Sequence, residues 1–482
     1  MSGRKHSSSS YVLRGGQIID GAGTPRYAGD VVVEGSRISA ILPPGKGKAD
    51  RVIKVDGNVV CPGFIDSHSH DDLQVLKRTV PHSKLSQGVC TVVTGNCGIS
   101  LAPLMTDTPP PPLDILGASG YRFDRFADYL QAVDAARPSV NVVPLVGHTS
   151  IRIKHVQDLS RTASQNETRA MRQEVSDAMD AGAFGLSTGV YYPPARAAST
   201  EELLEVCSAL EGHKAVLAMH IRDEADNVVE ALQEALAVGA RSSAMLVISH
   251  HKVMGAANHG RITDTLKMID EAATRQGVCL DCYPYEASST MLDAAKASRI
   301  GNVLITWSKP YPGASGRTLI SLAEEWHVQL HEAASKLMPG GAIYFSMSQQ
   351  DVDRVLTHPA TMIGSDGLPH DQRPHPRLWG TFPRVLGHYS RDRKLFPLEA
   401  AIHKMTGLPA ERFGLFGRGV LKEGYAADLV VFDPERIREG ATYENPTAPA
   451  IGLNLVAVNG HIAMWKGDVI DSHAGQRLAP WL

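Results

Sequence analysis

The chain has 482 residues, of which 48 are basic and 51 acidic. This length excludes a small disulfide scaffold or a lone binding module, and a 43% share of hydrophobic residues is enough for a sizeable core. The formal net charge of −3 leaves no large field of either sign with which to hold nucleic acid or an anionic membrane. No apolar run approaches the roughly 20 residues that a membrane span needs.

The start of the chain and its cysteines bear on where the protein works. The first residues, MSGRKHSSSSYV, are polar and lack the apolar core of a signal peptide. Six cysteines are too few for a disulfide framework in a chain of this length, and we expect all except Cys97 to be buried filler. We therefore expect a soluble, cytoplasmic protein, a monomer or small homo-oligomer, that binds neither nucleic acid nor a membrane.

Eight short apolar runs follow one another along the chain, and each ends in polar residues capable of chemistry. They span residues 59–68, 91–97, 140–148, 183–189, 215–221, 244–251, 278–285 and 360–367. Near-continuous apolar runs are typical of parallel strands covered on both faces. The stretches between them include a helical pattern over 167–183 that closes on a glycine, and another after Ser199 and Glu202, which form a capping-box pattern.

The alternation of strands and helices predicts an α/β fold, specifically a (β/α)8 TIM-like barrel over residues 63–415. In such a barrel the chemistry lies at the C-terminal ends of the strands, where the polar residues of these runs stand. A doubly wound open sheet is the main rival, but no Gly-rich phosphate turn follows the first strand.

Two further units are predicted outside this repeat. The 83 residues from Tyr283 to Asp366 exceed the spacing of the preceding units by about one unit, so we interpret about 286–345 as an insertion near the barrel mouth. Short strands with Gly-containing turns occur at both ends of the chain. We expect residues 1–62 and 416–482 to pair into one small β-sandwich domain.

Residues that bind metals stand at the ends of several predicted strands. His68 and His70 are two residues apart, so both imidazoles face the same side of the first strand. Cys97 lies in GNCG, where glycines allow close backbone approach, and His220 and His250 end the fifth and sixth strands. A lone histidine is more often a core or surface residue, and a lone cysteine is usually filler. Together, at corresponding strand ends, they predict a metal site, since thiolate and imidazole bind zinc.

Asp366, in IGSDG, ends the eighth strand. An aspartate at such a turn is frequently only a turn former or a helix cap. Beside a metal site it can also bind the metal or accept the proton of a water molecule.

These motifs resemble a known family over essentially the whole chain. PGFIDSHSH on the first strand, histidines ending strands five and six, and SDG on strand eight are similar to the amidohydrolase superfamily. GNCGIS, HIRDE, ISHHKVMG, GSDGLPHD and PHPRLWGTFPRVLGHYSR resemble the D-aminoacylases, which are N-acyl-D-amino-acid deacylases. The resemblance implies zinc-dependent hydrolysis of N-acyl-D-amino acids to a carboxylic acid and a free D-amino acid. The preference for D over L rests on it alone.

The resemblance also implies how the ligands divide. Cys97, His220 and His250 would hold a tight zinc ion. His68, His70 and Asp366 would line a second, weaker site, with Cys97 able to reach both.

The substrate's α-carboxylate needs a cationic clamp. Arg377 and Lys252 are the best candidates, with Tyr283, Ser289 and Tyr192 beside them, because a guanidinium can hold a carboxylate in bidentate fashion. The alternatives are that Lys252 and Ser289 are solvated loop residues, that Tyr192 packs on the prolines that follow it, and that Arg377 serves stacking beside Trp379. We further expect His251 to orient a metal ligand, and Lys296 to be either a surface lysine or a contact for the substrate's side chain.

The chemistry that these residues indicate is metal-assisted amide hydrolysis, in which Asp366 takes a proton from water and returns it to the departing amine. A serine hydrolase is disfavoured because GLSTG lacks the nucleophile elbow. Two other classes stay open. One is a dihydropyrimidinase-like amidohydrolase that acts on cyclic amides, although the strand-four lysine of such enzymes has no counterpart in AFGLSTG. The other is a non-catalytic barrel that binds metal for stability.

Overall fold

The eight apolar runs form parallel strands in the computed structural model, which describes residues 10–77, 82–470 and 473–480. The predicted α/β fold is confirmed. In chain order the strands are β6 (Phe64–Asp66), β7 (Val89–Thr94), β10 (Asn141–Pro144) continued by β11 (Val146–Gly147), β12 (Gly185–Gly189), β13 (Val216–His220), β14 (Met245–Ile248), β15 (Val278–Cys282) and β19 (Thr361–Ile363).

Each strand pairs in parallel with the next one along this series, apart from the break at Leu145 between β10 and β11. The first and last strands also lie side by side. The backbone N–H of Asp366 donates to the carbonyl of His68 at 2.8 Å, and Ser69 forms a parallel bridge with Gly367. The residues that follow β6 and β19 are thereby brought together, although about 300 positions separate them in the sequence.

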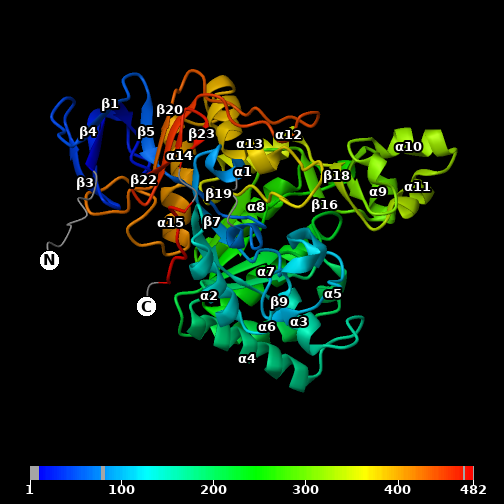
Figure 1. Cartoon of the computed structure of the whole chain (residues 1–482). Coiled ribbons are helices and arrows are strands. Elements are labelled where there is room, and N and C mark those ends of the chain that lie inside the picture. The colour runs from blue at the N-terminus through cyan, green and yellow to red at the C-terminus, as the bar shows by residue number, and fades with distance from the viewer. Residues whose placement is uncertain (1–9, 78–81, 471–472, 481–482) are drawn as a thin grey trace.

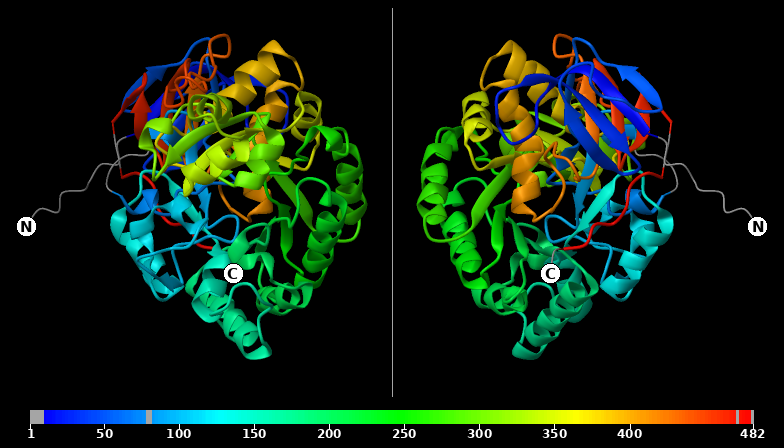
Figure 2. Two further views of the ribbon diagram at one scale, coloured as in Figure 1. Left: turned by 90° about the vertical axis from the view of Figure 1, so that its right-hand side faces the viewer. Right: turned by 90° about the vertical axis from the view of Figure 1, so that its left-hand side faces the viewer.

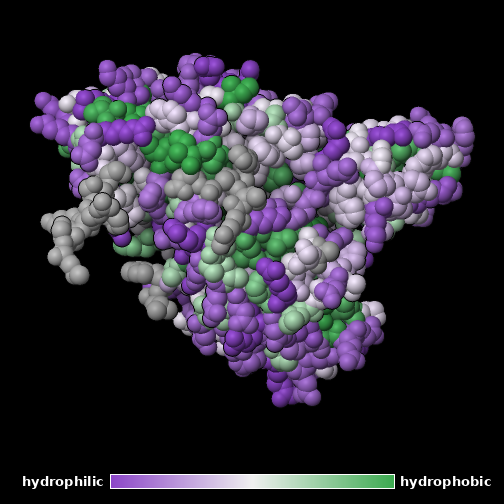
Figure 3. All heavy atoms as spheres, viewed as in Figure 1, coloured by the Kyte–Doolittle hydropathy of each residue, from purple (hydrophilic) through white to green (hydrophobic). Residues whose placement is uncertain are grey.

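Helices cover the outside of these strands (Figures 1 and 2). They are α2 (Phe126–Ala136), α3 (His148–His155), α4 (Gln165–Ala181), α6 (Thr200–Cys207), α7 (Val228–Ser242), α8 (Ile262–Ala273), α12 (Gln349–Thr357), α13 (Arg377–Arg384), α14 (Leu398–Met405) and α15 (Gly407–Arg412). Among the described residues, no helix combines the length and the apolar character that crossing a membrane requires. Figure 3 shows that hydrophilic side chains predominate around α4, at the bottom of that view.

The caps of these helices agree only partly with the sequence patterns. Helix α4 begins at a complete capping box between Ser164 and Glu167 and ends at Gly182, whose φ of 108° suits a glycine. At α6, Ser199 accepts from the N–H of Glu202, but the Glu202 carboxylate does not return the bond. That carboxylate instead contacts Arg152 at 2.9 Å, so a buried ion pair replaces half of the predicted capping box.

The predicted strand 59–68 is two strands that belong to different sheets. Residues of β5 (Val59–Pro62) pair with both ends of the chain, whereas β6 joins the parallel series. The two strands are separated at Gly63, where a Cβ atom would collide with the Sγ of Cys90. Only glycine permits this approach between the two sheets.

Both ends of the chain contribute to one nine-stranded sheet. Its central pairing joins β5 antiparallel to β20, with Cys61 opposite Val430, and apolar residues of both ends, among them Leu13 and Leu455, share one core. The blue and red segments therefore lie together in Figure 1. The other strands are β1 (Ser10–Ile18), β2 (Tyr27–Glu34), β3 (Arg37–Leu42), β4 (Arg51–Lys54), β20 (Leu429–Phe432), β21 (Leu453–Val458), β22 (His461–Trp465) and β23 (Asp468–Val469).

The surplus segment between strands seven and eight forms a separate lobe, at the right of Figure 1. Its three strands form an antiparallel sheet, and its helices pack with it around a core that includes Leu322, Leu337 and Tyr344. The elements are β16 (Ala287–Met291), α9 (Ala294–Ile300), β17 (Val303–Ser308), α10 (Leu319–Trp326), α11 (Leu330–Leu337) and β18 (Gly340–Phe345).

A buried ionic cluster secures the junction between the first and last parallel strands. Lys84, in α1 (His82–Leu85), places its fully buried Nζ 2.7 Å from Asp66 Oδ2, 3.0 Å from Asp71 Oδ2 and 3.0 Å from Ser365 Oγ. Asp66 in turn accepts from the backbone N–H of Ser365 at 2.7 Å. This cluster fixes the backbone position of Ser365, the residue before Asp366.

Replacing Lys84 by Met should destabilise the fold by about 3–5 kcal/mol, because Asp66 and Asp71 would be left as buried carboxylates without a counter-ion. The free energy of unfolding in urea measures this. Lys267→Met is the matched control: that lysine is 77% exposed and pairs with Glu271 only at 3.9 Å, so its loss should cost less than about 1 kcal/mol. Equal losses for the two variants would contradict a structural role for the cluster.

Candidate metal centre and active site

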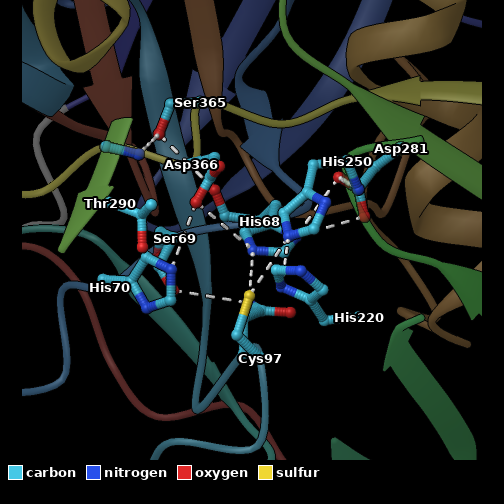
Figure 4. A network of polar contacts seen from close by, with 12 residues as sticks. His68, Ser69, His70, Cys97, His220, His250, Asp281, Thr290, Ser365 and Asp366 are labelled. Carbon is cyan, nitrogen blue, oxygen red and sulfur yellow. Dashed lines mark hydrogen bonds and ion pairs between the residues drawn. The ribbon is translucent and has the colours of Figure 1, made fainter. Parts of the chain in front are cut away.

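Cys97 lies at the middle of a cluster of imidazoles (Figure 4). It follows β7 by three residues and is 1% exposed. Its Sγ is 3.3 Å from Nε2 of His68 and 3.3 Å from Nε2 of His250. Burial alone would raise the pKa of the thiol, but the facing imidazoles of His68 and His250 outweigh it and hold the pKa well below its usual value. The geometry thus favours a thiolate.

Two groups of three residues that could each hold a metal ion share this sulfur. In one, Cys97 is joined by His220 and His250, and in the other by His68 and His70; within each group the donor atoms lie within 4.8 Å of one another. His220 ends β13, and its Nδ1 is 3.0 Å from His250 Nε2. The structure thus brings together all five residues that the sequence suggested as cysteine and histidine ligands.

Asp366 completes the cluster from the last strand. Its Oδ1 is 3.2 Å from His70 Nε2 and 3.6 Å from His68 Nε2, and its Oδ2 is 2.9 Å from Arg377 Nη1. Burial would raise the pKa of this carboxyl, yet Arg377, followed by the imidazole of His70, holds it well below its usual value. Asp366 is therefore a carboxylate that faces the imidazoles.

Three residues of the cluster have left-handed backbone. Cys97, His250 and Asp366 have φ values of 55°, 36° and 47°, a conformation that costs non-glycine residues roughly 1–3 kcal/mol each. Residues in this strained conformation persist where contacts with the surrounding fold hold the backbone in place, and they are common at functional sites. Near Cys97, Gly95 and Gly98 also have positive φ, of 76° and 74°.

Asp281, which the sequence reasoning overlooked, supports the cluster from behind. Its Oδ1 lies 3.2 Å from His68 Nδ1 and accepts from the backbone N–H of His250 at 2.8 Å. It thereby favours the imidazole orientation in which His68 presents Nε2 to Cys97. A signal existed, since Asp281 is a charged residue inside the apolar run 278–285.

Four of the five predicted substrate residues lie on one side of the cluster. Arg377 is fully buried beside Asp366, donates through Nη2 to the carbonyl of Ser289 at 3.0 Å, and places its guanidinium 4.5 Å from the ring centre of Tyr283. Tyr192 reaches the same lobe strand through Thr290 Oγ1, at 3.2 Å. The hydroxyls of Tyr283 and Ser289 are buried without a hydrogen-bond partner among the described residues. Such unsatisfied donors are what a polar ligand would engage.

The fifth, Lys252, already has a partner. Its Nζ lies 2.6 Å from Glu224 Oε1 and 2.9 Å from His250 Nδ1, so it is neither a solvated loop residue nor a free cation. His251 contacts Thr265 Oγ1 of α8 at 2.9 Å, which differs from the expected contact with a metal ligand. Its other ring nitrogen is buried without a hydrogen-bond partner in the described part of the chain.

Lys296 projects from the lobe toward the cluster. Its Nζ donates to the hydroxyl of Tyr191 at 3.1 Å and lies 4.5 Å from the ring centre of Tyr344. Burial lowers its pKa to about 8. The ring of Tyr191 stacks on His220, with 4.9 Å between centroids, and lines a cavity of about 620 Å³ together with Glu224. Lys296 is therefore not an ordinary surface lysine.

Comparison with known proteins fits this geometry. A family model described as "Amidohydrolase family" matches residues 51–464. A D-aminoacylase of Alcaligenes xylosoxydans xylosoxydans is 52% identical over 469 residues, which are 97% of this chain and 97% of that protein. The chain belongs to the D-aminoacylases of the amidohydrolase family. The resemblance seen in the sequence motifs is thus confirmed.

Solved D-aminoacylase structures share the whole fold. A crystal structure of a D-aminoacylase matches with a TM-score of 0.95 at 52% identity, over 98% of this chain and 99% of that one. The N-acyl-D-glutamate deacylase of Bordetella bronchiseptica, solved with zinc and a phosphonate inhibitor that mimics the tetrahedral intermediate, matches with a TM-score of 0.94 at 42% identity, over 97% and 99%.

The residues clustered around Cys97 in this chain fit a metal ion. A buried thiolate with imidazole nitrogens directed at it is the donor set that zinc prefers, and the two groups of three leave coordination positions open.

Replacing Cys97 by Ala should abolish tight zinc binding, because the sulfur belongs to both groups of potential ligands. Zinc content after dialysis, measured by atomic absorption, checks this. Cys207→Ala removes a buried thiol from α6, remote from the cluster, and should leave zinc content unchanged. Full zinc content in the Cys97→Ala protein would refute the role of the sulfur.

Proposed function

We propose that this protein hydrolyses the amide bond of N-acyl-D-amino acids, releasing a carboxylic acid and a free D-amino acid, with zinc as its cofactor. The observation that carries the proposal is the position of Asp366, a carboxylate between the imidazoles of the cluster and the buried guanidinium of Arg377. One side of this carboxylate faces potential metal ligands, and the other faces a cation suited to an acid substrate. The similarity to a D-aminoacylase and to an N-acyl-D-glutamate deacylase supports the same reaction.

Cys97, His220 and His250 would hold a tight zinc ion, and His68, His70 and Asp366 a second, weaker one, with Cys97 within reach of both. A zinc ion held by these residues would supply a nucleophile near neutral pH and act as a Lewis acid. Because these side chains are buried, charge interactions in the cluster are stronger than they would be in water.

Asp366 carries the proton. Its carboxylate takes a proton from the attacking water and gives it to the amine nitrogen as the C–N bond breaks. The backbone bond from Asp366 N–H to the carbonyl of His68, at 2.8 Å, holds the residue in place. Arg377 holds the pKa of this carboxyl below its usual value, so Asp366 is ionised.

Arg377 binds the substrate's α-carboxylate, assisted by the unpartnered hydroxyls of Tyr283 and Ser289. Tyr192 shapes the same side of the pocket through its contact with the lobe. Lys252, held by Glu224, adds positive charge next to this site.

Around this site we propose a closed (β/α)8 barrel over about 63–415, with the lobe of about 286–345 near its mouth. The segments 1–62 and 416–482 would form the small β-sandwich domain, of which 1–9, 471–472 and 481–482 lie outside the described residues. The side-by-side position of β6 and β19 supports closure of the barrel. We further propose a cytoplasmic monomer or small homo-oligomer, to which six free, buried cysteines are suited.

Two measurements test the proposal against the alternatives. One is the zinc content of the protein, and the other is its rate of hydrolysis of an N-acetyl-D-amino acid. A dihydropyrimidinase-like enzyme would open a cyclic amide, and a structural metal site would hold zinc without turnover. Hydrolysis of the N-acetyl-D-amino acid that zinc removal abolishes supports the proposal. The absence of a lysine from β12, GLSTG, already disfavours the cyclic-amide class.

Asp366→Asn keeps the side-chain size but cannot act as a base, so kcat should fall by at least about 10²–10⁴-fold. Zinc should remain at the tight site, which does not include Asp366. Steady-state kinetics and zinc content are measured on the same sample. A variant with ordinary kcat would rule out the proposed proton transfer.

Arg377→Lys keeps the charge but loses the bidentate fork, and KM should rise, with kcat falling too if the clamp aligns the amide. The control is an amide substrate whose α-carboxylate is replaced by a neutral group. On that compound the unaltered enzyme should lose most of the kcat/KM that it has on the carboxylate substrate. Arg377→Lys has already lost the clamp, so its kcat/KM should fall little further when the carboxylate is removed. The same proportional loss for both proteins would show that Arg377 does not bind the carboxylate.

A further inference from the structure

One carboxylate lies behind both histidines of the Cys97–His220–His250 group. Glu224 follows β13 by four residues and is 3% exposed. Its Oε1 is 3.1 Å from His250 Nδ1, and its Oε2 is 3.6 Å from His220 Nε2. These are the ring nitrogens that face away from the shared cluster, because His250 Nε2 and His220 Nδ1 are the pair that approach each other at 3.0 Å.

An ammonium group competes for the same nitrogen. Lys252 Nζ lies 2.9 Å from His250 Nδ1, closer than the carboxylate. A neutral imidazole has one N–H and one lone pair, and only the lone pair can bind a metal. An ammonium can only donate, so beside Nδ1 it favours the tautomer whose proton is on Nε2. That tautomer would direct its N–H, rather than its lone pair, at Cys97.

The carboxylate has the opposite effect. Glu224 can only accept when ionised, so it favours a proton on His250 Nδ1 and leaves Nε2 free. Its Oε1 also accepts from Lys252 Nζ at 2.6 Å, and its negative charge offsets the charge of the ammonium beside the ring. The second oxygen favours a proton on His220 Nε2 in the same manner, though at the longer distance of 3.6 Å.

We propose that Glu224 is a positioning residue that selects the metal-binding tautomer of His250 against the competing Lys252. The proposal rests on the metal role of His250 put forward above. One carboxylate thus contacts two histidines that would bind the metal, and also a lysine that lies beside the proposed substrate site. Because Glu224 offsets the effect of the ammonium, Lys252 can lie next to His250 while Nε2 of that histidine stays free to bind a metal.

Zinc affinity of the full-length protein, measured by competition with a chromophoric chelator, tests this. In E224Q the ammonium remains 2.9 Å from Nδ1 without its carboxylate, and zinc should bind about 10–100-fold more weakly. In E224Q/K252M the competing donor is also gone, and most of the affinity should return. A carboxylate that merely filled space would give a double variant no better than the single one.

Two further proteins sharpen the comparison. E230Q removes a carboxylate from the rim of the same cavity, on α7, and should bind zinc as tightly as the unaltered protein. K252M alone should bind zinc at least as tightly, since it removes only the competitor. This variant tests the proposal even if E224Q fails to fold: weaker zinc binding in K252M would overturn it.

Nitrogen-15 and proton spectra of histidine-labelled, zinc-loaded protein read the bond to Glu224 itself. The Nδ1–H of His250 should have the downfield proton shift of a hydrogen bond to a carboxylate in the unaltered protein and lose that shift in E224Q. The proposal is wrong if this resonance is unchanged in E224Q, or if E224Q binds zinc as tightly as the unaltered protein. Because neither readout uses a substrate, a protein that shows both effects but hydrolyses no N-acyl-D-amino acid would refute the proposed function alone. A protein that binds no zinc would refute both.

Discussion

A buried sulfur atom that two imidazole nitrogens approach at 3.3 Å is the constraint on which the rest of the structure depends. An unpaired buried thiolate is costly, so Cys97 requires positive or metal-binding partners on several sides. Its partners His68 and His250 are 29 and 153 residues away in the sequence. Only a fold that collects the ends of distant strands can satisfy this, and a parallel series does so because every strand ends on the same face.

The strands and the ligands could be predicted because their signals are local. An apolar run that ends in a histidine or cysteine predicts both a buried strand and a metal-binding side chain at the end of that strand, as at Cys97 and His220. The break at Gly63, which divides the predicted first strand into β5 and β6, could not be predicted in this way. It accompanies the close approach of Cys90 to Gly63, and residues 59–68 show the same apolar pattern that one uninterrupted strand would show.

The partners of charged side chains were beyond the reach of the sequence for a similar reason. A lysine two residues after His250 suggested a substrate contact, but nothing local shows that Lys252 meets the carboxylate of Glu224, 28 positions earlier. The capping-box pattern at Ser199 is half formed because Glu202 finds Arg152 in three dimensions, and a buried ion pair outweighs one more bond at a helix end. Local patterns identify which residues are available, and the tertiary fold decides which of them meet.

The pairing of β5 with β20 has a consequence for how the chain is made. Strand β5, fully buried in the finished protein, lies between β1 and β20, so one of its edges waits for residues near 430. At about 5–20 residues per second, synthesis takes roughly 20–70 s to supply that neighbour. Until then β5 lacks the neighbour that covers this edge, and an uncovered apolar strand edge is a template for pairing with other chains. Slower translation would lengthen the time for which the edge lacks its partner.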